Sequence, residues 1–270
     1  MKILDIHSHF HTDRDEGTVG YLKEKGHILP GATGSVGGLV NYMRKHGISF
    51  SVNMPVAWKP EGVRVMNALM EKQNAANSNI ISFAAMHPAL GREEIMQELL
   101  LIKHGGFKGI KIHPQEQSFW PDSDEMRPVY EFCGKENIVI LTHAGAGSDT
   151  SFNKDEVRAR PEKIGVVIRE YPELKMIAAH MGGLNMWDEA EKFLLGKNIF
   201  FDTAYSEIMP AELMKDFILR HGAERVLYGT DYPWQDAGII GGMVLGAANE
   251  LGDAEKIMFR NAEQLLGISV

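Results

Sequence analysis

The chain has 270 residues, of which 44% are hydrophobic and 24% charged, and its formal net charge is −8. Acidic and basic residues are interspersed, which argues against a nucleic-acid-binding surface, and no apolar run approaches the ~20 residues of a membrane helix. A single cysteine, Cys133, excludes an internal disulfide and suits a reducing compartment, so we expect a cytoplasmic protein without a signal peptide, membrane contact or nucleic-acid partner.

Short runs rich in Ile, Val and Phe alternate along the chain with longer stretches of helical periodicity. The predicted strands span residues 2–7, 48–54, 80–86, 107–113, 138–143, 175–180, 199–204 and 225–231. The predicted helices span residues 36–46, 61–77, 92–104, 126–136, 160–171, 187–196 and 210–221, with one or two more after residue 238. Strand–helix alternation implies parallel strands, and eight such units predict an α/β protein of the (β/α)8 TIM-barrel type. A doubly wound open sheet is the alternative, but no Gly-rich nucleotide turn supports it.

We expect one domain over residues 1–270, with a loop insertion at residues 12–35 after the first strand. The insertion is polar and Gly-rich, as is typical of a lid or binding loop. His11 lies where the first strand gives way to this loop, so we expect it to line the pocket or bond the loop rather than to bind a metal.

The first strand ends in the histidine pair of "DIHSHFH". Side chains alternate along a strand, so Asp5, His7 and His9 share one face, and two imidazoles at positions i and i+2 can converge on one cation. An isolated pair of this kind is weak evidence. Asp5, one layer below, is expected to be a hydrogen-bonding partner of a ligand histidine.

Three later strands also end in polar groups that precede Gly or Pro loops: "VILTHAG" ends in His143, "MIAAHMGG" in His180 and "VLYGTDYPW" in Asp231. Active sites of this fold lie at the carboxyl ends of the strands. Burying several such groups together is costly unless they are paired or bind a metal. Histidines and a carboxylate at one barrel mouth match a divalent cation, with zinc as the first candidate and manganese or another ion as the alternative.

The segments "DIHSHFH", "GIKIHP", "LTHAG", "HMGG", "YGTDYPW" and "FRNAEQLLG" resemble the amidohydrolase superfamily. Within it the chain is similar to the amidohydrolase-2 branch of aminocarboxymuconate semialdehyde decarboxylase-like metal-dependent hydrolases. The resemblance runs from the first strand to the last helix and implies a metallo-dependent (β/α)8 barrel. It implies that His7, His9, His143 and Asp231 are metal ligands, and that His180 is a catalytic group near the metal.

The fourth predicted strand, "FKGIKIHPQ", bears on the number of ions. Binuclear relatives often bridge two ions there with a glutamate or a carboxylated lysine. Lys111 and His113 share a face of this strand, and no acidic residue stands in it. We therefore expect one ion, with Lys111 holding a substrate carboxylate; a carboxylated Lys111 and two ions form the alternative.

The pocket rim supplies candidates for substrate binding. Every tryptophan (Trp58, Trp120, Trp187 and Trp234) lies in or just beyond a loop that follows a predicted strand. Indole suits half-buried places, so these residues predict either loop packing or an aromatic-lined mouth. Arg158, with Lys154 and Arg160, is a candidate to bind an anion, although surface solubility explains such residues equally well. The predicted substrate-binding set is Lys111, His113, Trp120, Arg158 and Trp234.

Three functions fit these residues. The first is metal-dependent hydrolysis of a small-molecule ester, lactone or amide, with Asp231 as general base for a metal-bound water and His180 polarising the carbonyl. The alternative is a metal-dependent, non-oxidative decarboxylase of an aromatic or unsaturated carboxylic acid, in which Asp231 and His180 handle the proton that replaces carbon dioxide. A catalytically silent barrel is the third, and the intact site set argues against it. A homodimer is the default expectation for the oligomeric state.

Overall fold

The computed structural model describes residues 1–10, 28–147 and 152–269. The chain divides into two compact units. Unit 1 contains Met1–Pro55, Asn77–Ile81 and Asp202–Val270, and unit 2 contains Val56–Ala76 and Ser82–Phe201. Residues 12–27 of the predicted insertion, together with His11, lie outside the described residues. The expectation of a single domain stays a prediction.

Unit 1 is built on parallel strands around β1 (Leu4–Ser8). β1 pairs with β2 (Phe50–Asn53), and β3 (Ile80–Ser82) follows in the order β1-β2-β3. The segment containing β9 (Val226–Leu227) is bonded to the other edge of β1, where Ile6 N donates to Tyr228 O at 2.8 Å. β1 therefore lies between two neighbours, and all five of its residues are buried.

Unit 2 carries a parallel sheet whose strands follow one another in chain order. They are β4 (Ala84–Ala85), β5 (Gly109–Ile112), β6 (Val139–Thr142), β7 (Met176–Ala178) and the first two residues of β8 (Phe200–Asp202). Gly109 lets β5 approach its neighbour closely, because a Cβ there would lie 2.3 Å from the ring of Phe83. Both faces of β5 are buried, as expected for a strand of a parallel sheet.

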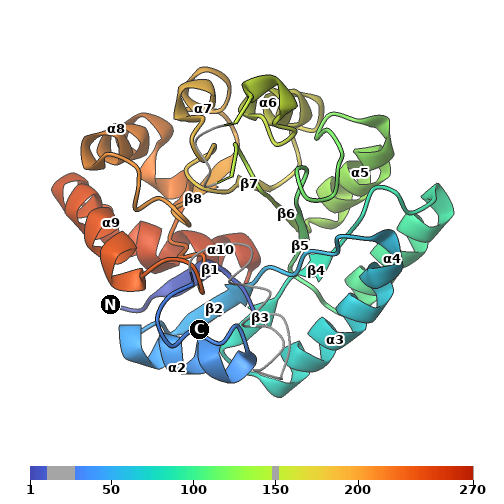
Figure 1. The fold of residues 1–270 in the computed structure, drawn as a ribbon, viewed down its shortest axis with the longest axis horizontal. Helices are drawn as coiled ribbons and strands as arrows, with labels where there is room; N and C mark the ends of the chain where they lie inside the picture. Colours follow the sequence, from blue (N-terminus) through green and yellow to red (C-terminus); the bar gives the residue numbers. More distant parts are fainter. Residues whose placement is uncertain (11–27, 148–151, 270) are drawn as a thin grey trace. The chain divides into compact units, whose positions relative to one another are not determined.

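Helices connect the strands and keep them parallel. In unit 1 they are α2 (Val36–His46), α8 (Ala211–His221), the short η4 (Ala223–Arg225), α9 (Ala237–Leu251), the π-helical η5 (Lys256–Arg260) and α10 (Asn261–Leu266). In unit 2 they are η1 (Pro60–Gly62), α3 (Val63–Ala76), α4 (Arg92–His104), η2 (Asp124–Met126), α5 (Arg127–Glu136), η3 (Lys154–Glu156), α6 (Pro161–Glu170) and α7 (Trp187–Phe193). Figure 1 shows β5, β6 and β7 side by side, with α5, α6 and α7 on the same side of these strands.

Most predicted helices are confirmed within a residue or two, and α2 and α4 have the expected bounds. Ser35 caps the start of α2, where its Oγ accepts from Gly38 N at 3.0 Å, and Gly47, which has a left-handed φ of 68°, caps its end. The helix predicted at 187–196 is shorter, because α7 ends at Phe193. The predicted strand 80–86 is interrupted at Phe83, so β3 and β4 are separate strands.

Three strands that lead to site candidates end earlier than predicted. β6 ends at Thr142, β7 at Ala178 and β9 at Leu227, so His143, His180 and Asp231 stand one to four residues beyond them. His180 and Asp231 both have φ of 61°, which breaks the extended conformation at these positions. The site candidates therefore belong to the first turns of the loops that follow the strands. Among the described residues, no helix combines the length and apolar character needed to cross a membrane.

Candidate metal and active site

The backbone of unit 1 brings the histidines of β1 to the loop that carries Asp231. Asp231 N donates to His7 O at 2.7 Å, and His9 N donates to Tyr232 O at 2.7 Å. Ser8 and Tyr232 form a parallel bridge between the two segments. This pairing brings together two backbone segments whose residues are more than two hundred positions apart in the sequence.

His7, His9 and Asp231 form a buried group with suitable ligand atoms. Oδ1 of Asp231 lies 3.1 Å from Nε2 of His9 and 3.7 Å from Nε2 of His7. One ligand atom from each residue lies within 4.8 Å of the other two, and the three residues are 1%, 8% and 6% exposed. Two imidazole nitrogens and a carboxylate oxygen held at this spacing fit a divalent metal ion.

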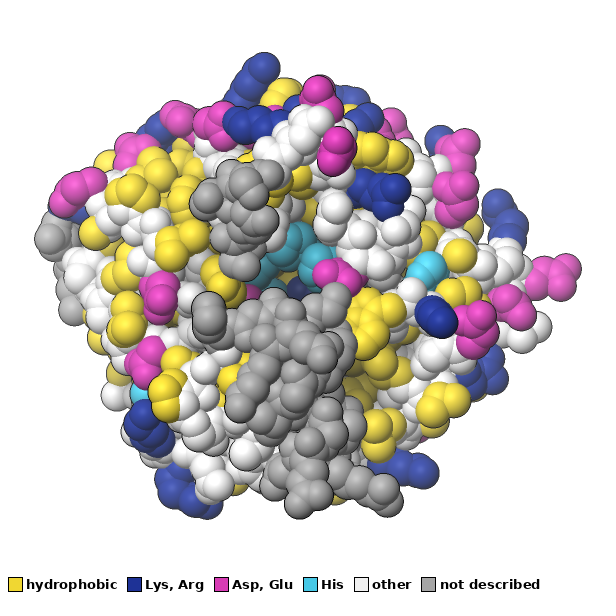
Figure 2. All heavy atoms as spheres, in the orientation of Figure 1, with side chains coloured by type: hydrophobic (Ala, Val, Ile, Leu, Met, Phe, Trp, Pro, Cys, Tyr) yellow, Lys and Arg dark blue, Asp and Glu magenta, His cyan; other side chains and the backbone are white. Residues whose placement is uncertain are grey.

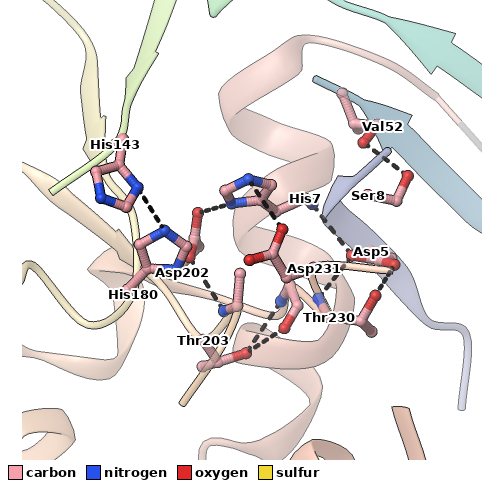
Figure 3. Close-up of polar contacts among 12 residues, drawn as sticks. Asp5, His7, Ser8, Val52, His143, His180, Asp202, Thr203, Thr230 and Asp231 are labelled. Carbon is pink, nitrogen blue, oxygen red and sulfur yellow. Dashed lines mark hydrogen bonds and ion pairs between the residues drawn. The ribbon is translucent and has the colours of Figure 1, made fainter. Parts of the chain in front are cut away.

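Asp202 completes this part of the site, and sequence analysis did not single it out. Oδ2 of Asp202 lies 2.8 Å from Nδ1 of His7, and both side chains are almost fully buried. Its signal was present, since the apolar run "IFFDTA" places a carboxylate at a strand end as the other site strands do. We call His7, His9, Asp202 and Asp231 the histidine–aspartate cluster; Figure 3 labels His7, Asp202 and Asp231 of this cluster.

Asp5 bonds to the backbone of a proposed ligand histidine and not to its ring. Its Oδ1 accepts from His7 N at 3.1 Å and from Thr230 N at 3.0 Å, and its Oδ2 accepts from Thr230 Oγ1 at 2.7 Å. The carboxylate that accepts from the ring of His7 is that of Asp202. Asp5 instead joins the backbone of β1 to the segment that leads to Asp231. Burial raises the pKa of Asp5 to about 7, although these hydrogen bonds favour its ionised form.

Unit 2 holds a second group of predicted residues, His113, His143 and His180, which we call the histidine cluster. Nδ1 of His143 lies 3.0 Å from Nε2 of His180 (Figure 3). The ring of His113 stacks on that of His143 with centroids 4.1 Å apart and planes inclined by 9°. Imidazoles thus contact one another directly in this cluster.

The backbone around the histidine cluster sets the tautomer of His143. Its Nε2 lies 3.0 Å from the carbonyl oxygen of Ala146. A carbonyl oxygen can only accept, so in neutral His143 the proton is on Nε2 and the lone pair is on Nδ1. His180 Nε2–H then donates to that lone pair. Trp187, at the start of α7, donates from Nε1 to the carbonyl oxygen of His180 at 3.1 Å and supports the same loop.

Gly145 holds the two loops of the histidine cluster together. It forms a parallel bridge with Leu184, and a Cβ at Gly145, where φ is 86°, would lie 2.3 Å from the nitrogen of Leu184. Glycine is therefore required for this approach. The bridge brings the loop after β6, which carries His143, to the loop after β7, which carries His180.

The predicted substrate-binding residues lie in different surroundings. Trp234 in unit 1 packs its ring edge on His9, with centroids 5.1 Å apart. Lys111 is 1% exposed in β5, where it pairs with Ala85 and Leu141 across the sheet. The structure therefore brings Trp234 to the histidine–aspartate cluster and places Lys111 in β5, with His113 directly after the end of this strand.

Trp120 and Arg158 contact other partners. Lys163 of α6 lies over the ring of Trp120, 5.9 Å from its centroid, and Trp120 is 36% exposed. The backbone nitrogen of Arg158 donates to Oε1 of Gln115 at 2.8 Å, which links the loop after β6 to the loop after β5.

The other two basic candidates are paired with acidic residues of α7. Lys154 forms an ion pair with Asp188 at 2.7 Å, and Arg160 forms one with Glu189 at 2.8 Å. Figure 2 shows basic and acidic side chains interspersed around the face that it draws. The charges of Lys154 and Arg160 are thus compensated within the protein, which favours a structural role for both.

No protein of curated function matches the sequence. Several solved structures have the same fold. 2,6-Dihydroxybenzoate decarboxylase from Rhizobium is 21% identical, with a TM-score of 0.72 and 99% of each chain covered. Dihydroxybenzoic acid decarboxylase from Polaromonas sp. JS666, with bound manganese and the inhibitor 2-nitroresorcinol, is 18% identical, with a TM-score of 0.68, covering 98% of this chain and 97% of that one.

An uncharacterised TIM-barrel protein from Bordetella bronchiseptica is 21% identical, with a TM-score of 0.69 and 99% of each chain covered. These similarities confirm the predicted (β/α)8 fold. The sequence model of the amidohydrolase-2 family, described as "Amidohydrolase", matches residues 55–268, which is more than half of the chain. The chain belongs to the amidohydrolase-2 family, as its motifs predict.

Proposed function

We propose that this protein is a metal-dependent, non-oxidative decarboxylase of an aromatic or unsaturated carboxylic acid. The observation that carries the proposal is the buried group of His7, His9 and Asp231, whose ligand atoms lie within 4.8 Å of one another. Two of the solved structures that share the fold are decarboxylases of dihydroxybenzoic acids. The similarity supports decarboxylation, which sequence analysis placed second, better than hydrolysis.

The proposed ligands of one divalent ion are His7, His9, His143 and Asp231. The tautomer of His7 supports this set, because the hydrogen bond to Asp202 leaves Nε2 of His7 with a lone pair. Nδ1 of His143 accepts from His180, so His143 would exchange this hydrogen bond for the ion. Histidine nitrogen and carboxylate oxygen suit zinc, and the manganese in the Polaromonas enzyme makes manganese the second candidate. A second ion bound by carboxylated Lys111 is the alternative.

A divalent ion bound there would neutralise and orient the substrate's oxygen atoms. The residues then supply the proton chemistry. The bond between the ring carbon and the carboxylate breaks, its electron pair stays on the carbon, and a proton from the Asp231–His180 pair takes the place of carbon dioxide. Its burial makes Asp231 a suitable proton donor in a water-poor site.

The proposed substrate contacts are those predicted from the sequence. Trp234 is favoured by its contact with His9, and its indole N–H has no hydrogen-bond partner within the described part of the chain. Lys111 and His113 would bind an acidic substrate from β5 and the loop that follows it, and Arg158 would do so from the loop after β6. Trp120 is the weakest of the five candidates, because it packs against Lys163 and is partly exposed.

Hydrolysis of an ester, lactone or amide by a metal-bound water is the competing proposal. Family membership supports it in general terms, since the same metal-binding residues serve both reactions. A small-molecule substrate is proposed in either case. A homodimer and a cytoplasmic location stay predictions from the sequence.

Carbon dioxide release separates the two reactions. The protein, reconstituted with zinc or manganese, is incubated with 2,6-dihydroxybenzoate and other aromatic acids, and in parallel with lactones, phenyl esters and anilides. We expect carbon dioxide from at least one acid, with one solvent deuterium on the product carbon in D2O. Turnover of esters, lactones or amides alone would establish hydrolysis instead. A protein that binds metal but converts neither set would support the silent-barrel reading.

A further inference from the structure

His7 is oriented by a carboxylate that the proposed reaction does not use. Oδ2 of Asp202 lies 2.8 Å from Nδ1 of His7, and the two side chains are 0% and 1% exposed. Oδ1 of Asp202 accepts from Ala204 N at 3.1 Å. This backbone bond fixes the carboxylate plane at the end of β8, so that Oδ2 faces the imidazole (Figure 3).

The hydrogen bond sets the tautomer of His7. An ionised carboxylate only accepts, so Nδ1 of His7 carries the proton, and the lone pair of the neutral ring is on Nε2. Nε2 is the atom that faces Asp231, with 3.7 Å between it and Oδ1. Only a ring nitrogen with a lone pair can bind a metal ion, and therefore the bond to Asp202 decides which atom of His7 is available.

We infer that Asp202 is a positioning residue for the metal site: it holds His7 in the Nδ1–H tautomer, which leaves the lone pair of Nε2 for the ion. The inference rests on the proposed function in one respect, namely that His7 binds a divalent ion. A carboxylate behind a ligand histidine strengthens metal binding, and its loss typically weakens binding about 10- to 100-fold.

His143 offers a contrast within the same protein. Its tautomer is set by the neutral carbonyl of Ala146 and not by a carboxylate. A carbonyl orients the ring but withdraws the proton less strongly than an anionic carboxylate does. Of these two histidines, His7 is thus the one whose ring is oriented by a side chain that can be replaced without changing a proposed ligand.

The first measurement is the affinity of the metal-free protein for Zn2+, determined by competition with a chromophoric chelator. The variant is Asp202→Asn, which keeps the shape of the side chain and removes the charge. We expect its affinity to fall about 10- to 100-fold. Asp216→Asn is the matched control, because Asp216 is an exposed residue of α8 that pairs with Arg220 at 2.8 Å. Its affinity should equal that of the wild type.

The second measurement is the tautomer of His7 in the metal-free wild-type protein. Nitrogen-15 NMR of the imidazoles, with the signal identified by its loss in His7→Gln, should show a protonated Nδ1 and an unprotonated Nε2. In Asp202→Asn the signal should shift towards the Nε2–H form. A purely structural role of Asp202 would lower the melting temperature without changing this signal.

The results separate the inference from the proposed function. Zinc binding by the wild type that is unchanged in Asp202→Asn would overturn the inference alone. A wild-type His7 with its proton on Nε2 would also overturn it, even if the variant does not fold. A wild type that binds no zinc would refute the metal site and the inference together.

Discussion

The two clusters of polar side chains use opposite chemistry. In the histidine–aspartate cluster each imidazole faces a buried carboxylate: His7 faces Asp202, and His9 faces Asp231. In the histidine cluster imidazoles contact imidazoles, and a backbone carbonyl sets the tautomer of His143. Carboxylates beside imidazole nitrogens suit a cation, whereas imidazole rings in hydrogen-bond contact suit proton transfer. Each unit by itself thus carries a different kind of chemistry: unit 1 has the side chains that a cation prefers, and unit 2 has imidazoles arranged for passing a proton.

The largest effect is expected for Asp231→Asn, which removes the carboxylate shared by His7 and His9. An amide is a weaker ligand and can neither release nor take up the proton, so turnover should fall about 10³-fold. Turnover with the identified substrate and circular dichroism are measured together, and Asp216→Asn again serves as the control. Near-wild-type turnover with an intact fold would show that the Asp231 carboxylate is neither a required metal ligand nor the proton donor.

Next in size is His180→Asn, which tests the proton role of the histidine cluster. We expect kcat to fall about 10²-fold while the metal content remains that of the wild type. The matched variant is His9→Asn, which should lose metal as well as activity. Metal content is determined by mass spectrometry of the purified proteins. A metal-free His180→Asn protein would instead make His180 a ligand.

A smaller effect is expected for Asp5→Asn, measured as stability. Three donors, His7 N, Thr230 N and Thr230 Oγ1, bond to the Asp5 carboxyl group. An amide cannot accept all three bonds, so the free energy of unfolding of the metal-free protein should fall by about 2 kcal/mol. Urea unfolding measures this, and the exposed Asp216→Asn should change it by less than about 0.5 kcal/mol. Equal stability of the two variants would show that Asp5 does not join these segments.

The smallest effect is expected for His113→Ala. The ring of His113 supports His143 by stacking at 4.1 Å, and losing such a contact costs about 1 kcal/mol, or about fivefold in kcat/KM. His113→Phe keeps a flat ring but lacks the nitrogens proposed to bind the substrate, so it should restore only the part of the loss that comes from stacking. If the Ala and Phe variants lose equal activity, His113 acts through its nitrogens and contacts the substrate directly.

Local patterns were sufficient for the element order and for several boundaries. The bounds of α2 and α4 follow from periodicity and flanking glycines, and these are local properties of the sequence. Strand ends were less well predicted, since β7 stops two residues before His180. The positive φ of His180 and Asp231 could not be predicted from the alternation of side chains, because neither histidine nor aspartate requires a left-handed backbone.

The family, the alternation of strands and helices and the polar residues that follow the strands could all be predicted from the sequence, because each depends on short runs of residues. Which side chains become hydrogen-bond partners is known only from the tertiary structure. Asp202 meets His7 across 195 positions, and Asp5 meets Thr230 across 225. Hydrogen-bond partners and tautomers depend on which strands become neighbours and on the direction of each loop, and neither is encoded in residue spacing. For that reason His7 could be identified as a ligand candidate from "DIHSHFH", whereas "IFFDTA" could mark Asp202 only as a carboxylate at a strand end and not as the partner of His7.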